Sequence, residues 1–243
     1  MAGPMTQGHG GVDALAGVTT LPQLLRWRVR LTPGAAAYRQ FDAQAGRWVG
    51  YSWQEIDAEF ERWRRALAAE GFAPGERVAI LMPNGIAHIA MDQAALSRGL
   101  VPVPMHAIDN PESIGYILQD SEASLLFVDS GERWRAIEAS GATIGNLKRV
   151  VCASHTGTSD RAVTDSRIVA LGRWLEPGAA VQAAMNDVEV QPSDLAAIVS
   201  TSGTTGRPEG VMLSHENIVA NAKAIHRRIA AGQDDIFPSF LPL

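Results

Sequence analysis

The sequence predicts an α/β fold in which a mostly parallel sheet is flanked by helices. Between residues 74 and 152, short apolar runs alternate with longer segments of helical periodicity. This alternation is typical of a parallel sheet that is covered on both faces. The chain has 243 residues, of which 46% are hydrophobic, so it can bury a sizeable core as one large domain or two small ones.

A leader and a helix are expected at the start of the chain. Residues 1–18 are rich in glycine and predict a flexible leader. Thr20 precedes a stretch of apolar periodicity that predicts a helix over 21–31, which ends before Pro33. The folded domain is therefore expected over residues 19–243.

A hairpin and a long helix are expected next. Residues 35–41 and 47–51 predict two strands joined by a short turn. Ser52 and Glu55 have the spacing of a capping box, which predicts that a helix begins at this point.

This long helix is expected to end at Gly71. Apolar residues spaced by 4, 3 and 4 form one stripe along it, and they are Ile56, Phe60, Trp63 and Leu67. The stripe predicts that Trp63 is a core residue rather than one that stacks on a ligand.

The parallel part of the fold follows. Its expected strands are 78–82, 101–104, 125–128 and 149–152. Its expected helices are 85–98, 111–120 and 132–140, with Asn84 capping the first and Asn110 the second. His88 and Asp92 lie one helical turn apart, either as a catalytic pair or, in the interpretation we favour, as a satisfied structural pair. Residues 153–165 predict a surface loop before a short helix around Trp174.

Composition excludes several classes of protein. The net charge of −5 argues against a nucleic-acid-binding protein. Lys148 and Lys223 are the only lysines, so a site that requires a lysine has two candidates. Cys152 is the single cysteine, falls in an expected strand and is interpreted as buried and inert. Because the sequence has neither a signal-peptide pattern nor a long apolar run, we expect a cytoplasmic protein without a transmembrane segment.

One loop has the composition of a phosphate-binding site. It joins two expected strands, 195–199 and 211–213, and precedes a helix expected over 216–229 with its cap near Ser214. Three glycines and four Ser or Thr hydroxyls lie between Thr201 and Gly210. Glycines bring backbone N–H groups close to an anion, and hydroxyls add uncharged donors. By composition alone, the loop is either a polyphosphate site or a hydroxyl-rich hairpin turn, and it lacks the Walker pattern.

The order of residues in this loop resembles a known family. The string from Thr201 to Val211, continued by Leu213-Ser214-His215-x-Asn217, resembles the signature loop of the adenylate-forming superfamily. That superfamily includes acyl-CoA synthetases, luciferases and the adenylation domains of peptide synthetases. Further stretches resemble the family's N-terminal region in the same order, and they are 51–53, 75–80, 82–84 and 101–104. The closing residues 239–243 resemble the long-chain fatty acyl-CoA branch.

The resemblance implies the acyl-CoA synthetase-like fold and an AMP-forming long-chain fatty acid–CoA ligase. In the implied reaction, a carboxylate attacks the α-phosphate of Mg²⁺-bound ATP, pyrophosphate leaves, and coenzyme A displaces AMP. The implied cofactors and partners are ATP with Mg²⁺, coenzyme A and a fatty acid. The residues implied to contact the ATP phosphates are Thr201, Ser202, Gly203, Thr204, Thr205 and Gly206. Donors preorganised there would stabilise the charge that develops on pyrophosphate.

Two features depart from the family pattern. Glu209 stands at the family's loop-lysine position, where a carboxylate would repel a triphosphate, and Arg207 is the candidate compensating cation. The family's later motifs for metal, for ribose and for catalysis lie beyond Leu243. We therefore expect the N-terminal portion of the large AMP-binding domain, without its C-terminal part or small domain. No catalytic residue or metal ligand is expected within this chain.

Three functions stay open at this stage. In the first, the chain is the N-terminal portion of a long-chain ligase and is inactive alone. In the second, it is a non-catalytic remnant that retains a weak nucleotide or partner site. In the third, it is part of an adenylating enzyme for another acid. Glu209 favours the second function, whereas the apolar closing segment favours the first over the third. If residues 236–243 form a strand without neighbours, its edge predicts association into a homo-oligomer.

Overall fold

The computed structural model describes residues 15–154, 165–176, 188–202, 208–229, 232 and 235–239. The helices are α1 (Leu21–Leu31), α2 (Trp53–Glu70), α3 (Ile86–Ser97), α4 (Pro111–Asp120), α5 (Gly131–Ala139), α6 (Leu171–Trp174) and α7 (His215–Arg228). The strands are β1 (Ala36–Asp42), β2 (Arg47–Ser52), β3 (Arg77–Leu81), β4 (Val101–Pro104), β5 (Leu125–Ser130), β6 (Arg149–Ser154), β7 (Ile168–Ala170), β8 (Leu195–Ser202) and β9 (Pro208–Ser214).

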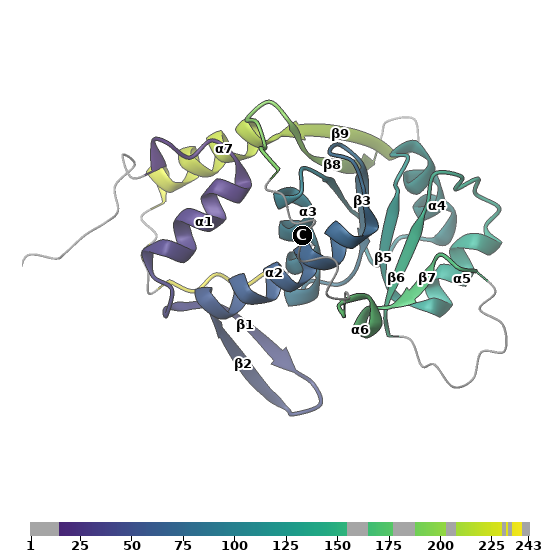
Figure 1. Ribbon diagram of the computed structural model, residues 1–243, viewed down its shortest axis with the longest axis horizontal. Helices are drawn as coiled ribbons and strands as arrows, with labels where there is room; N and C mark the ends of the chain where they lie inside the picture. The colour runs from purple at the N-terminus through teal and green to yellow at the C-terminus, as the bar shows by residue number, and fades with distance from the viewer. Residues whose placement is uncertain are drawn as a thin grey trace, which may run out of the picture.

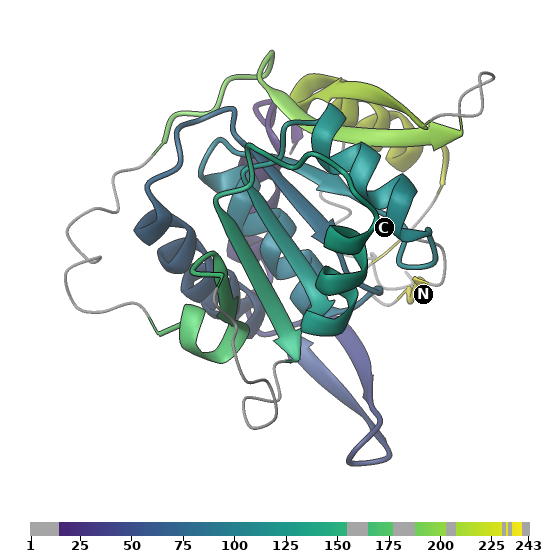
Figure 2. The same ribbon diagram turned by 90° about the vertical axis from the view of Figure 1, so that its right-hand side faces the viewer.

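A parallel sheet of five strands forms the centre of the molecule, in the order β4-β3-β5-β6-β7. Side chains alternate along β3, so Val78 and Ile80 join one core cluster whereas Ala79 and Leu81 join a second. Helices α2 and α3 pack in the first cluster and α4 and α5 in the second (Figures 1 and 2). The predicted fold class is therefore confirmed.

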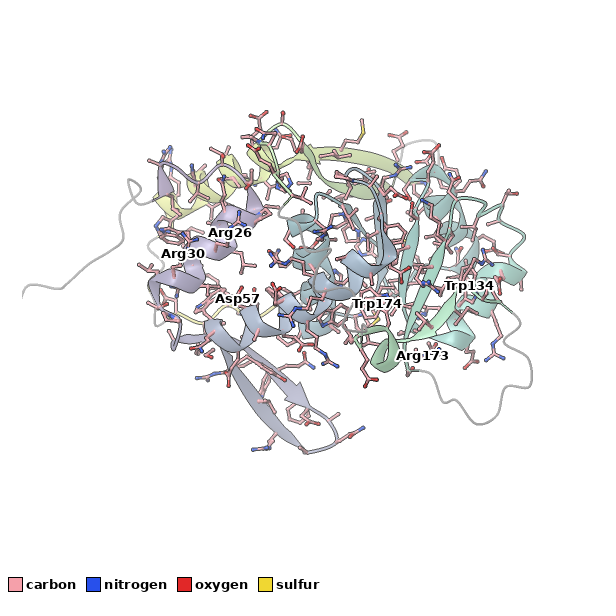
Figure 3. All side chains as sticks on the ribbon, in the orientation of Figure 1. Arg26, Arg30, Asp57, Trp134, Arg173 and Trp174 are labelled. Atoms are coloured by element: carbon pink, nitrogen blue, oxygen red, sulfur yellow. The ribbon has the colours of Figure 1, made fainter. Side chains whose placement is uncertain are left out.

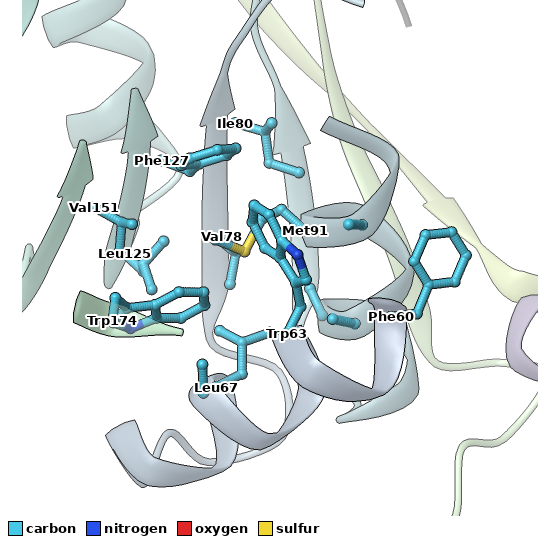
Figure 4. Close-up of a cluster of buried hydrophobic side chains, with 14 of the residues drawn as sticks. Phe60, Trp63, Leu67, Val78, Ile80, Met91, Leu125, Phe127, Val151 and Trp174 are labelled. Atoms are coloured by element: carbon cyan, nitrogen blue, oxygen red, sulfur yellow. The ribbon is translucent and has the colours of Figure 1, made fainter. Parts of the chain in front are cut away.

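The first cluster is centred on Trp63, which is 2% exposed. Its ring meets Phe127 and Trp174 edge-on, with ring centroids 5.3 and 5.8 Å away (Figure 4). Its indole N–H donates to Glu59 Oε1 at 2.8 Å. The predicted core role of Trp63 is confirmed, and its polar atom is satisfied at the rim of the cluster.

Local sequence signals determine where several helices begin and end. Ser52 Oγ accepts from the Glu55 N–H at 3.2 Å, and Glu55 Oε2 accepts from the Ser52 N–H at 2.7 Å, which completes the expected capping box. Gly71 ends α2 with a φ of +71°, a conformation that favours glycine. Asn110 caps α4 by accepting from the Ser113 N–H at 2.8 Å. These predictions depended on contacts within four residues, and they are confirmed.

The start of α3 differs from the prediction. Asn84 does not cap this helix; its amide donates to Ser239 Oγ at 3.2 Å. Gln40 of β1 supplies the missing acceptor, because its Oε1 takes the Ile86 N–H at 2.7 Å. The predicted Asn84 cap was wrong because a residue from the distant hairpin occupies that role.

Other segments differ or lie partly outside the described residues. Strand β7 was not predicted, since three residues are too few for a periodic pattern. Residues 235–239 belong to no strand, so that part of the expected closing strand is absent, and 240–243 lie outside the described residues. Leu15 and Val18, assigned to the leader, are buried against Val219 of α7, whereas residues 1–14 lie outside the described residues.

Candidate functional site

The signature loop lies at the closed end of an antiparallel hairpin formed by β8 and β9. Its register pairs Ser200 with Gly210, Thr201 with Glu209 and Ser202 with Pro208. The two strands therefore bring both ends of segment 203–207 together. Four of the candidate phosphate-contacting residues lie outside the described residues, and they are Gly203, Thr204, Thr205 and Gly206. The candidate compensating cation, Arg207, lies outside them as well.

Thr201 and Glu209 face each other where the described part of the hairpin approaches its turn. Both residues are exposed, and Thr201 Oγ1 donates to the Glu209 carbonyl oxygen at 3.4 Å. Ser202 has its backbone in β8, in register with Pro208. The hairpin therefore presents one of the expected hydroxyls and the unexpected carboxylate together at the surface.

Gly210 packs tightly against β8 and lies near the end of α4. A Cβ at this position would lie 3.0 Å from Ile198 Cγ2 and 3.9 Å from Asp120 Oδ2. Asp120 ends α4 shortly before β5 begins, so this part of the hairpin lies near the amino edge of the parallel sheet. A second exposed carboxylate, that of Asp120, therefore lies along the hairpin, and it adds to the negative charge of Glu209.

Helix α7 anchors the other end of the hairpin. Ser214 caps this helix, and the buried imidazole of His215 accepts the Leu21 N–H at its Nδ1, 3.2 Å away. Burial lowers the pKa of His215, and the charge of Asp194 partly opposes this change. Lys223 Nζ donates to the Val18 carbonyl oxygen at 2.7 Å, so this lysine is engaged with the N-terminal segment rather than with the loop.

His88 and Asp92 have separate partners. His88 Nδ1 lies 3.2 Å from the Met82 carbonyl oxygen, whereas Asp92 Oδ2 accepts from the Gln93 amide at 3.0 Å. Burial lowers the pKa of His88 and raises that of Asp92 to about 6. These contacts favour a structural role for each residue over a catalytic pair.

Sequence reasoning gave Asn84 only a capping role, although it follows the carboxyl end of β3. The strand order reverses at β3 and β5, and in open α/β sheets ligands bind beyond the carboxyl ends at such a reversal. Asn84 and the nearby Ser239 stand at that edge. The signal that could have identified this position is the predicted strand order itself. The hairpin and this pair occupy different edges of the sheet.

A cavity of about 440 Å³ lies against α1, away from the hairpin. The residues that line it are Val18, Gln23, Arg26, Trp27, Arg30 and Leu31. Arg26 and Arg30 project from α1 one helical turn apart (Figure 3). None of the signature residues that the structure describes contributes to its lining.

Two properties of the described residues bear on cofactors and membranes. Within them, no group of three or more His, Cys, Asp or Glu side chains could hold a metal ion. The use of Mg²⁺ with ATP stays a prediction from the resemblance. No helix in the described part of the chain is both long and apolar enough to cross a bilayer. Cys152 is buried, and burial raises the pKa of its thiol to about 11, in agreement with the inert role expected from the sequence.

Comparison with known proteins gives concordant matches. The family described as AMP-binding enzyme matches residues 25–243. The chain is 30% identical over 217 residues to long-chain-fatty-acid–CoA ligase 1 of Homo sapiens, across 82% of this chain and 30% of the human protein. It is also 30% identical over 168 residues to 3-hydroxybenzoate–CoA/4-hydroxybenzoate–CoA ligase of Thauera aromatica, across 69% of this chain and 30% of that protein.

A solved structure supports the same relationship. The chain superimposes on the inhibitor-bound N-terminal domain of FACL13 from Mycobacterium tuberculosis with a TM-score of 0.65 and 28% identity, across 82% of this chain and 45% of that one. The chain spans less than half the length of the curated relatives that it matches.

Proposed function

Because this chain belongs to the AMP-binding enzyme family, we propose that it is the N-terminal portion of an ATP-dependent, AMP-forming acid–thiol ligase that acts on a long-chain fatty acid. The similarity to the human long-chain ligase supports this acid class. The similarity to a hydroxybenzoate ligase makes an aromatic acid the alternative. The proposed reaction forms an acyl-adenylate and pyrophosphate, and coenzyme A then displaces AMP to give the thioester.

The observation that supports this function most directly is the position of the signature loop. The register of β8 and β9 brings Ser202 beside Pro208, which places the two ends of segment 203–207 next to each other. The glycines and hydroxyls of that segment's sequence supply the kinds of donor that a polyphosphate requires. We propose that these donors hold the β- and γ-phosphates of ATP and stabilise the charge that moves onto pyrophosphate. Mg²⁺ would supply further neutralisation of that charge.

Glu209 is proposed to weaken this phosphate site. Its side chain is exposed next to the turn and forms no ion pair with any residue that the structure describes. A carboxylate ~6 Å from one phosphate charge, at an effective dielectric of ~20, gives a repulsion of roughly 3 kcal/mol, and less than ~1 kcal/mol in a fully wet loop. The nearby Asp120 adds charge of the same sign. This arrangement favours a second candidate function, a non-catalytic protein that retains weak nucleotide binding.

The test is a calorimetric titration of ATP into the wild-type chain and into Glu209→Lys. Charge reversal should tighten binding on the order of ten-fold or more, with a smaller gain at high salt. Thr204→Ala should weaken binding by roughly 1 kcal/mol, because one hydroxyl donor is lost. Glu132→Lys is the matched control, since it changes the net charge equally from the surface of α5. Equal affinities for wild type and Glu209→Lys at both salt concentrations would refute the proposed placement of this residue against the phosphates.

A turnover assay tests whether this chain alone catalyses the complete reaction, which neither candidate function predicts. The chain covers only 30% of the human ligase, so we propose that it needs further polypeptide for catalysis. Incubation with ATP, Mg²⁺, palmitate and coenzyme A should release no AMP. Turnover at the rate of a complete ligase would show that this proposal is wrong.

A further inference from the structure

The cavity against α1 combines hydrogen-bond donors with apolar side chains (Figure 3). Gln23, Arg26 and Arg30 occupy positions i, i+3 and i+7 of the helix, so they share one of its faces. Trp27 and Leu31 follow the two arginines in the sequence and line the same cavity with apolar surface. No acidic side chain is among the described residues that line it. The lining therefore favours a ligand that is both anionic and partly apolar.

The two arginines of this cavity have no partner among the described residues. Helix α1 contains three arginines and no acidic residue. Arg28 has its own contacts, because it donates to Thr32 Oγ1 at 2.6 Å and lies over the Trp53 ring. Arg26 and Arg30 are exposed, and neither forms an ion pair or a hydrogen bond within the part of the chain that the structure describes. Two cations are therefore available to one anion.

Contacts behind the cavity hold its walls in place. Gln23 Oε1 accepts the N–H groups of Thr19 at 2.8 Å and Thr20 at 3.3 Å, which orients its amide and leaves the amide nitrogen without an acceptor among the described residues. Val18 lines the cavity from the preceding segment, and its carbonyl oxygen is held by Lys223 of α7. A ligand that enters walls already ordered in this way loses less affinity to the cost of ordering them.

We propose that this cavity binds a small aromatic phosphate ester. Arg26 and Arg30 would pair with the phosphate, since the planar guanidinium matches phosphate geometry. A phosphate monoester carries close to two negative charges at pH 7, which two arginines can neutralise, whereas a carboxylate carries one. The ring would pack on Trp27 and Leu31. The volume of about 440 Å³ lies within the range of small-molecule sites. This site is separate from the proposed ATP loop and does not rest on the proposed function.

The test is a calorimetric titration of phenyl phosphate into the 243-residue chain. Wild type should bind it, and Arg26→Gln/Arg30→Gln should bind at least ten-fold more weakly, because two charge-assisted hydrogen bonds are lost. Arg227→Gln/Arg228→Gln is the matched control, since it removes the same charge from exposed positions at the end of α7 and should bind as wild type does. All four arginines are exposed, so both double variants should keep the wild-type urea denaturation curve.

Further titrations separate the parts of the ligand and the two sites. Trp27→Leu should weaken binding of phenyl phosphate several-fold and leave that of inorganic phosphate unchanged. Benzoate should bind wild type more weakly than phenyl phosphate does. Thr204→Ala should bind phenyl phosphate as wild type does, so failure of this proposal is distinguishable from failure of the ATP titration. The proposal is overturned if wild type does not bind phenyl phosphate, or if both double arginine variants bind it equally well. Weaker binding by Thr204→Ala would also overturn it, because the ligand would then occupy the loop.

Discussion

Asp92 on α3 provides a test of the packing between the hairpin base and the central helices. Its carboxylate is partly buried, and the Gln93 amide is its hydrogen-bond partner. Burial raises the pKa of Asp92 from 3.8 to about 6, and the charge of Asp92 in turn helps to raise the pKa of Tyr38. The folded state therefore retains a proton over a pH range in which the unfolded state has released it.

The sign of the effect on stability follows from this difference in proton binding. Because the folded state binds more protons between pH 3.8 and about 6, stability decreases as pH rises through that window and then stays constant. A difference of about two pKa units corresponds to a loss of at most about 3 kcal/mol. Asp92→Asn keeps the shape and an acceptor for Gln93 but cannot ionise, so it avoids this loss.

Urea denaturation at pH 7.5 and pH 4 measures the effect. At pH 7.5, Asp92→Asn should raise the free energy of unfolding by up to about 3 kcal/mol, and at pH 4 the gain should nearly disappear. Asp120→Asn is the control, because that carboxyl is exposed at the end of α4. A gain of the same size at both pH values, or no gain at pH 7.5, would refute the assignment of an unfavourable buried charge to Asp92.

Two further predictions concern His215 and the exposed apolar surface. Burial lowers the pKa of His215, so the folded state resists protonation of this imidazole. Stability should therefore fall as the pH drops below 6.5, the ordinary pKa of histidine. His215→Asn retains an acceptor, so it should reduce this fall in denaturation curves taken between pH 7.5 and 5. Val211, Met212, Ile236 and Phe237 are exposed, so the chain should self-associate as concentration rises, and light scattering that reports a monomer throughout would contradict this expectation.

Local patterns explain why much of the fold could be predicted. The capping box at Ser52 and the glycine stop at Gly71 use contacts within one helical turn, so the sequence around them is sufficient. The start of α3 could not be predicted in this way, because its acceptor is Gln40, 46 residues away. Strand β7 is equally non-local, since its three residues form a strand through pairing with β6.

The candidate site was predictable in part. The apolar runs on either side of the loop predicted two strands, 195–199 and 211–213, whereas their antiparallel register, which extends to Ser202 and Pro208, came from the structure. The close approach of Gly210 to α4 depends on tertiary packing, so no pattern within the loop indicated the neighbouring Asp120. The role of His215 as an acceptor for Leu21 was hidden for the same reason, as 194 residues separate the two.

The contacts between the N-terminal segment and α7 have a consequence for the order of events during synthesis. Leu21 meets His215 and Val18 meets Lys223 across 194 and 205 residues, so these contacts cannot form until α7 leaves the ribosome. At a synthesis rate of roughly 5–20 residues per second, about 10–40 s pass between synthesis of the N-terminal segment and synthesis of α7. Meanwhile β3, β4 and β5 and their helices can assemble, because their partners lie close in sequence. Leu15 and Val18 are therefore synthesised early but complete their contacts late, and a ribosome that stalls before Lys223 would leave these two residues open to chaperones and proteases.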